Sequence, residues 1–114
     1  MSGNVDATKF LESNFGKLTF GEALKADRKS AELSQAQLAE AIGVSKQAIS
    51  GFENGKDFPT YETIKKIAKV FKMDEETYVR LLLQDIANKK GFDQYLVEVT
   101  RVSKSKGRAK KKAS

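Results

Sequence analysis

The sequence predicts an all-α fold, in which five helices form a bundle and one short C-terminal β-strand follows them. Apolar residues recur at intervals of three and four in five segments, which is the spacing that places them on one face of a helix. A Ser, Thr or Asp that is suited to cap a helix precedes each of these segments. A stretch near the C-terminus is instead rich in aromatic and β-branched residues, which favours a strand.

The composition excludes several kinds of site. The 114 residues suffice for one domain with a modest core. The absence of Cys and His excludes disulfides and thiolate metal sites, and it removes the commonest general base and zinc ligand. There is no glycine-rich phosphate loop and no cluster of metal ligands, so we expect no enzyme activity, no cofactor and no metal. Without a run of about 18 apolar residues or a secretory leader, we expect a cytoplasmic protein that does not contact membranes.

The net charge of +6 is distributed unevenly along the chain. Residues 101–114 hold seven Lys or Arg residues and no acidic residue, whereas the first 100 residues carry 14 basic and 15 acidic groups. Any attraction to phosphate groups therefore comes from a local patch or from the tail. We predict that the basic tail, residues 103–114, is disordered.

Residues 1–18 form a lead-in that has two interpretations. Asp6 is placed to cap a short helix that carries Phe10, Leu11 and Phe15 on one side. Such a helix would pack on the domain or on a second subunit. The alternative is a frayed, mobile lead-in, and the sequence leaves both interpretations open.

The first helix of the bundle is predicted from about Phe20 to Ala31. Thr19 and Glu22 have the spacing of a capping box, in which the side chain of each residue bonds the backbone N–H of the other. The residues expected to face the core are Phe20, Ala23, Leu24 and Ala31.

The stretch Ser34–Gly55 is typical of two short helices joined by a tight turn, which is the helix-turn-helix unit. We expect the helices at residues 35–42 and 46–54, with Gly43 at the corner because glycine adopts positive φ without a Cβ clash. Ala39 is small, so the two helices can approach each other closely. The residues predicted to seal this unit against a third helix are Leu38, Ile42, Val44, Ile49 and Phe52.

Two further helices complete the predicted bundle. Thr60 caps a helix from about Tyr61 to Lys72, and Asp74 caps a helix that ends at Gly91. The predicted buried stripe of the last helix consists of Val79, Leu82, Leu83 and Ile86.

Residues 91–102 contain the predicted strand, which runs from Tyr95 to Val102. A single strand leaves its backbone N–H and C=O groups unpaired and therefore needs a partner. The rest of the chain offers no second convincing strand, so we expect pairing with another chain, either a second subunit or a partner protein. The alternative is a loosely ordered tail.

The motif LSQAQLAEAIGVSKQAISGFENG resembles the helix-turn-helix of the Cro/C1-type phage repressor family, also called the xenobiotic-response-element family. The resemblance covers about residues 20–71 and includes Ala39, Gly43 and the closing Glu-Asn-Gly in register. It implies a lambda-repressor-like bundle of five helices that binds double-stranded DNA as a homodimer. The DNA-binding residues that it implies are Gln35, Ser45, Lys46, Gln47, Ser50, Asn54 and Lys56.

The roles that the resemblance implies suit the chemistry of these residues. Gln35 begins a helix, where its amide and the positive helix end favour a DNA phosphate. Lys46 and Gln47 open the recognition helix, and their side chains can bond guanine or adenine in the major groove. Gly51 departs from the family pattern, since many relatives carry a longer reading side chain there, so the readout is narrower or depends on DNA shape.

Four other residues have supporting roles under the same resemblance. Asn54 and Lys56 are expected over the DNA backbone. Arg28 and Glu53 correspond to an ion pair between the first and third helices, whose role is to orient the recognition helix rather than to contact DNA. The alternative for the polar residues of the recognition helix is an ordinary solvated face.

We therefore predict a transcriptional regulator, in the form of a repressor that binds an inverted-repeat operator as a homodimer. The alternative is an antitoxin, in which the C-terminal segment binds a toxin protein and DNA binding controls the protein's own operon. The region LLLQDIANKKGFDQYLVEVTRV is similar to the ends of some small helix-turn-helix antitoxin-like regulators. The predicted divisions of the chain are the lead-in (1–18), the DNA-binding domain (19–90), the strand for dimerisation or partner binding (91–102) and the tail (103–114).

Overall fold

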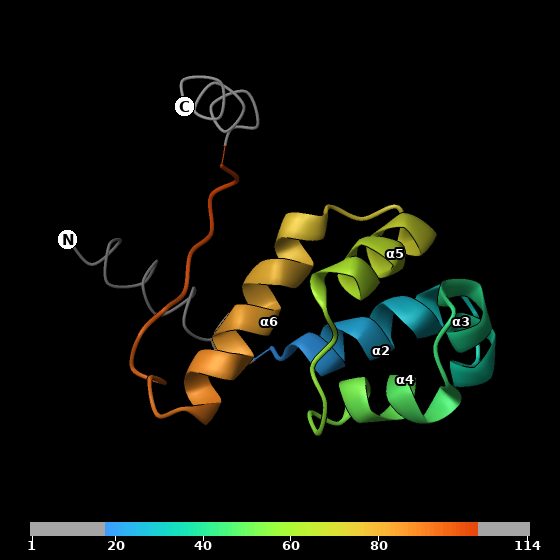
Figure 1. The fold of residues 1–114 in the computed structure, drawn as a ribbon, viewed down its shortest axis with the longest axis horizontal. Coiled ribbons are helices and arrows are strands. Elements are labelled where there is room, and N and C mark those ends of the chain that lie inside the picture. The colour runs from blue at the N-terminus through green and yellow to red at the C-terminus, as the bar shows by residue number, and fades with distance from the viewer. Residues whose placement is uncertain (1–17, 103–114) are drawn as a thin grey trace, which may run out of the picture.

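The computed structural model describes residues 18–102, and in this range five α-helices pack around one core (Figure 1). These helices are α2 (Phe20–Ser30), α3 (Gln35–Ile42), α4 (Lys46–Glu53), α5 (Tyr61–Phe71) and α6 (Glu75–Lys89). The predicted all-α bundle is therefore confirmed. The predictions of a lead-in helix and of a disordered tail concern residues 1–17 and 103–114, which lie outside the described residues.

Local hydrogen bonds start the first two of these helices at the predicted residues. The Thr19 hydroxyl accepts a bond from the Glu22 N–H at 3.0 Å, and the Glu22 carboxylate accepts one from the Thr19 N–H at 3.1 Å. Ser34 and Gln37 form the same capping box before α3. Gly43 ends α3 with a φ of 75°, a left-handed conformation that glycine adopts without Cβ strain.

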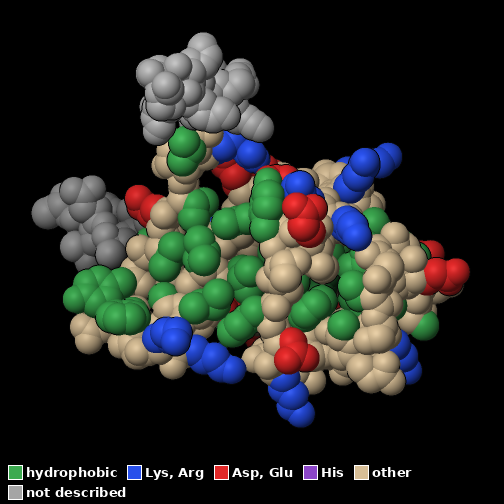
Figure 2. Space-filling view, in the orientation of Figure 1, with side chains coloured by type: hydrophobic (Ala, Val, Ile, Leu, Met, Phe, Trp, Pro, Cys, Tyr) green, Lys and Arg blue, Asp and Glu red, His purple; other side chains and the backbone are tan. Residues whose placement is uncertain are grey.

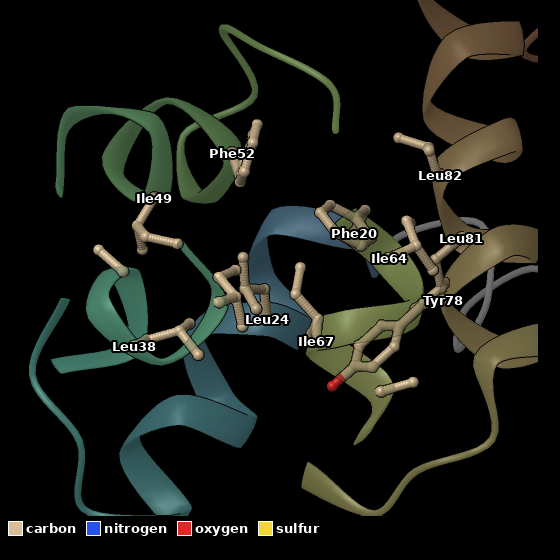
Figure 3. Close-up of a cluster of buried hydrophobic side chains, with 13 residues drawn as sticks. Phe20, Leu24, Leu38, Ile49, Phe52, Ile64, Ile67, Tyr78, Leu81 and Leu82 are labelled. Atoms are coloured by element: carbon tan, nitrogen blue, oxygen red, sulfur yellow. The ribbon is translucent and has the colours of Figure 1, made fainter. Parts of the chain in front are cut away.

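Side chains from all five described helices meet in one hydrophobic core (Figure 3). Leu38 of α3, Ile49 of α4 and Ile67 of α5 have no exposed surface. Phe20 of α2 packs edge-on against Tyr78 of α6, with 5.8 Å between the ring centroids. This aromatic pair ties the first described helix to the last, in the arrangement that ring quadrupoles prefer.

Gly21 allows α2 to cross closely over the end of α4. A Cβ atom added at Gly21 would lie 2.6 Å from the Phe52 carbonyl oxygen and would also overlap the Glu53 carbonyl oxygen. Both obstacles are backbone atoms, which cannot rotate away. Nothing in the local sequence marks this glycine, because the close contact joins two helices that are far apart along the chain.

The buried face of α6 differs from the predicted stripe. Leu82 is buried as predicted, but Leu83 is 41% exposed, and Val79 and Ile86 are only partly buried. The residues of this helix that are buried are Tyr78, Leu81, Leu82 and Gln84. Because α6 carries apolar residues on more than one side, their spacing does not determine which side faces the core. Ala31 was also expected to face the core, but it is the exposed C-cap of α2.

Residues 95–102 form no strand, so the predicted strand is wrong for the described chain taken alone. The physical reason is that residues 18–102 contain no other strand to pair with. Instead, this segment runs back along α6 (Figure 1). Gln84 takes the place of a partner strand, since its Nε2 donates to the Tyr95 carbonyl at 2.9 Å and its Oε1 accepts from the Val97 N–H at 2.7 Å.

The far end of this segment lies beside the start of α6. Arg101 Nη2 is 3.4 Å from Glu75 Oε2, and Arg101 Nε is 3.5 Å from Glu76 Oε2. The Tyr61 hydroxyl of α5 donates a hydrogen bond to the same Glu75 oxygen. The segment therefore follows most of the length of α6 and ends where α5 and α6 meet.

Several apolar side chains of α6 and of the segment after it are exposed to solvent. Figure 2 shows hydrophobic side chains gathered over these elements on one face of the molecule. The large hydrophobic residues of this region that are exposed are Leu83, Phe92, Tyr95, Leu96 and Val102. We call this set the C-terminal apolar surface. Contiguous exposed apolar surface often marks an interaction site in a soluble protein.

Candidate nucleic-acid interface

The outer face of α4 is polar and open to solvent. Lys46 and Gln47 are its first two residues and are exposed, and Ser50 lies one turn beyond Lys46. Ser45 is the N-cap, and its Oγ accepts a hydrogen bond from the Ala48 N–H at 3.0 Å. The Ser45 hydroxyl keeps its proton as a donor, and the helix dipole adds partial positive charge at this end. This end of α4 therefore offers donors and one amide acceptor to an approaching ligand.

Two more residues that were predicted to contact DNA, Asn54 and Lys56, lie where α4 ends. Asn54 is the C-cap of α4, and its Oδ1 accepts a hydrogen bond from the Lys56 N–H at 3.2 Å. This bond holds the turn and leaves the amide N–H groups of Asn54 as donors. Lys56 is exposed. Its ammonium group is therefore open to an anionic partner.

Gln35 has a partner within the protein, which the sequence did not indicate. It is half-buried at the start of α3, and its Nε2 donates a hydrogen bond to Glu53 Oε1 at 3.0 Å. Since an amide nitrogen carries two protons, one N–H of Gln35 remains for a phosphate. Gln35 thus joins the start of α3 to the end of α4, whether or not it also contacts DNA.

Arg28 of α2 and Glu53 of α4 form a buried ion pair with two hydrogen bonds. Arg28 Nε lies 2.7 Å from Glu53 Oε2, Arg28 Nη2 lies 3.1 Å from Glu53 Oε1, and the two side chains are 9% and 5% exposed. Arg28 Nη1 also donates to the Leu33 carbonyl at 2.8 Å. Together with Gln35, these groups form what we call the Arg28–Glu53 anchor, which fastens the C-terminal end of α4 to α2 and α3.

The anchor keeps the Glu53 carboxyl group ionised. Burial by itself disfavours the charged form, but the hydrogen bonds from Arg28 and Gln35 outweigh it and hold the pKa of Glu53 below its usual value. The hydrogen bond to Glu53 likewise raises the pKa of Arg28. The charged pair is therefore stable at neutral pH, and it holds α4 in one orientation on the bundle.

Gly51 and Asp57 form a contact that the sequence analysis missed. Gly51 is buried although it lies one turn beyond the exposed Gln47. The Asp57 side chain covers it: a Cβ atom added at Gly51 would lie 3.1 Å from Asp57 Cγ and would overlap Asp57 Oδ2. The N–H groups of Lys56 and Asp57 both donate to the Gly51 carbonyl, at 2.9 and 3.2 Å. The only signal in the sequence was a glycine inside a predicted helix.

Among the described residues, neither a metal site nor a membrane-spanning helix is found. Within residues 18–102, no three acidic side chains come together in a way that would hold a metal ion. Over the same residues, every helix is too short or too polar to cross a lipid bilayer.

Comparison with known proteins gives matches to the same part of the chain. The helix-turn-helix family matches residues 24–77. The HTH-type transcriptional activator BcrR of Enterococcus faecalis is 44% identical over 54 residues, which are 47% of this chain and 26% of that protein. The ImmF control region 10 kDa protein of Bacillus phage phi105 is 30% identical over 74 residues, which are 65% of this chain and 81% of that protein.

A third relative is the HTH-type transcriptional repressor RghR of Bacillus subtilis (strain 168). It is 46% identical over 59 residues, which are 51% of this chain and 44% of that protein. The match thus spans about a quarter of BcrR and less than half of RghR, but most of the phage protein. No solved structure gives a significant match.

Proposed function

The chain belongs to the Cro/C1-type helix-turn-helix family of transcriptional regulators, and from this premise we propose that it represses transcription by binding an inverted-repeat operator in double-stranded DNA as a homodimer. The family is one of DNA-binding regulators and not of enzymes. One of the matched relatives is named an activator and another a repressor, so the direction of regulation is part of the proposal. We also propose that the protein acts in the cytoplasm, where a bacterial or phage operator lies.

The observation that carries this proposal is the exposed start of α4 on its buried anchor. Lys46 and Gln47 project from the start of a helix whose C-terminal end is fastened by Arg28, Glu53 and Gln35. Reading base pairs requires such an arrangement, because a side chain that selects one base must be held in a defined register. Gln can bond adenine N6 and N7 together, and Lys can donate to guanine O6 and N7.

The proposed homodimer would place two copies of α4 on successive major grooves. Two half-sites about 10 base pairs apart, or a multiple of that spacing, are then expected in the operator. The C-terminal apolar surface supports a dimer, since it offers exposed apolar area on an element distinct from α4. Basic residues of the tail would add attraction to DNA without sequence preference.

The test begins with selection of bound fragments from random DNA by the purified protein. We expect a single symmetric site with two half-sites. In a second step, Gln47→Ala is expected to weaken binding to this site by about 1–3 kcal/mol and to leave binding to random DNA nearly unchanged. Lys66→Ala is the control, because Lys66 is an exposed side chain of α5 that lies outside α4 and outside residues 91–102. Equal losses on the selected site and on random DNA would show that Gln47 does not read bases.

A second candidate function is an antitoxin that captures a toxin protein. The feature that favours it is the segment 95–102, which lies on the surface and has only the Gln84 side chain in place of a partner strand. A partner chain can add to such a segment through its backbone. Co-expression with the gene that neighbours this one is the test. A stable complex that is lost when residues 91–102 are removed would favour the antitoxin, and free homodimers alone would contradict it.

A further inference from the structure

We propose that Asp57, in the loop after α4, selects cytosine at one base pair of each half-site. Its carboxylate fills the space that a side chain at position 51 of α4 would otherwise occupy. This inference rests on the proposed function, because it requires the outer face of α4 to lie in the major groove. It adds to that function the identity of a base and of the group that selects it. The structure places the Asp57 carboxylate against Gly51 of α4.

The geometry of α4 leads to this assignment. Gln47 and Gly51 are four residues apart, so the missing Cβ of Gly51 would point to the same side of the helix as Gln47, one turn further on. If Gln47 contacts one base pair, the group that fills the space beside Gly51 contacts a neighbouring base pair. Glycine itself offers no reading group.

The Asp57 carboxylate fills this space. Asp57 Cγ and Cβ lie 3.1 and 3.4 Å from the position of the missing Cβ, and the Oδ2 atom lies closer still. The loop is held there by the hydrogen bonds from the N–H groups of Lys56 and Asp57 to the Gly51 carbonyl. Asp57 itself is exposed, so the carboxylate touches α4 on one side and faces solvent on the other.

The Asp57 carboxylate is free to accept bonds from a ligand. Among residues 18–102, neither an ion pair nor a side-chain hydrogen bond engages it. An ionised carboxylate only accepts hydrogen bonds. In the major groove, cytosine presents the N4 amino group as a donor, whereas guanine presents the N7 and O6 acceptors, which would repel a carboxylate. Adenine places its N7 acceptor beside its amino group, so it is a poorer partner than cytosine.

The experiment compares base preferences of the wild type and four variants on the site selected from random DNA. Binding is measured for that site and for every single-base change across one half-site. The wild type is expected to prefer cytosine at one position by about tenfold over the other bases. Asp57→Asn is expected to shift this preference to adenine, since an amide bonds adenine N6 and N7, and Asp57→Ala is expected to remove it.

Two more variants test whether the base preference depends on where the Asp57 carboxylate lies or only on the net charge of the protein. Gly51→Ala keeps Asp57 but inserts a Cβ where the carboxylate lies, so the cytosine preference is expected to fall several-fold. Asp74→Asn is the matched control: it also removes one negative charge, but at the N-cap of α6, where Asn caps equally well. It is expected to leave every base preference unchanged.

The outcomes distinguish this inference from the proposed function. A selected site whose base preferences are the same for the wild type and Asp57→Asn overturns the role of Asp57 and leaves the DNA-binding function standing. A uniform gain in affinity for all sequences in Asp57→Ala also overturns it, because it would show that the carboxylate only repels phosphates. Failure to select any site from random DNA overturns both.

Discussion

Two arginine–glutamate contacts in this protein have similar chemistry and opposite surroundings. Arg28 binds Glu53 with a shortest distance of 2.7 Å, and the two side chains are 9% and 5% exposed. Arg101 lies 3.4 Å from Glu75, and these side chains are 53% and 21% exposed. Water and salt screen the second pair, whereas the first pair has exchanged water for protein hydrogen bonds. The comparison teaches that burial, rather than residue type, decides which contact can hold a helix in place.

The largest expected effect comes from breaking the buried pair. Arg28→Met leaves Glu53 charged and without its ionic partner inside the protein, so we expect the free energy of unfolding to fall by about 3–5 kcal/mol. Urea unfolding monitored by circular dichroism measures this loss. The matched control is Arg101→Met, the same change at the exposed pair. Equal losses of stability in the two variants would contradict the claim that the buried ion pair stabilises the fold more than the exposed one.

Acid should weaken the buried pair by protonating Glu53. Its pKa is lowered in the folded protein, so the stabilisation that it contributes is present above the unfolded-state pKa of about 4.3 and is lost as the pH falls through the folded pKa. We expect the stability difference between the wild type and Glu53→Gln to shrink below about pH 4. Urea unfolding of both proteins from pH 6 to 3 measures it. A difference that stays constant over this range would show that the charge of Glu53 does not stabilise the fold.

Gln84 extends the comparison to a buried side chain that is uncharged and holds the segment after α6 by hydrogen bonds alone. Gln84→Leu keeps an apolar stem in the buried position but removes the bonds to Tyr95 and Val97. We expect a loss of about 1–2 kcal/mol, since the N–H of Val97 loses its partner. Amide hydrogen exchange should become faster at Val97 and stay unchanged in α4. Unchanged exchange at Val97 would mean that Gln84 does not hold this segment.

The smallest effect is expected at the exposed pair itself. Arg101→Met should lower the free energy of unfolding far less than Arg28→Met does, because exposed ion pairs contribute little. The remaining difference from the wild type should vanish when the salt concentration is raised to about 1 M, where the screening length is about 3 Å. Urea unfolding at low and high salt measures both quantities. A loss that persists at high salt would indicate that Arg101 acts through packing of its stem rather than through charge.

The sequence by itself determined where the helices begin and where the turn after α3 lies. The Thr19–Glu22 and Ser34–Gln37 capping boxes and the left-handed turn at Gly43 depend on neighbours a few residues away, so their local sequence predicts them. It also indicated the polar start of α4, because the motif there has a recognisable order of small, apolar and polar residues. These features follow from interactions that operate within one or two helical turns.

Only the tertiary structure decided which groups meet across the bundle. It placed Gln35 on Glu53, laid Asp57 over Gly51 and left Leu83 in solvent. It also gave residues 95–102 the Gln84 side chain in place of a strand partner. Most of these outcomes depend on the distance between segments that are remote in sequence, and helix packing sets that distance through the whole core. The contact of Asp57 with Gly51 is shorter in range and depends on how the loop after α4 folds back. Apolar spacing and capping residues carry no information about the distance between remote segments.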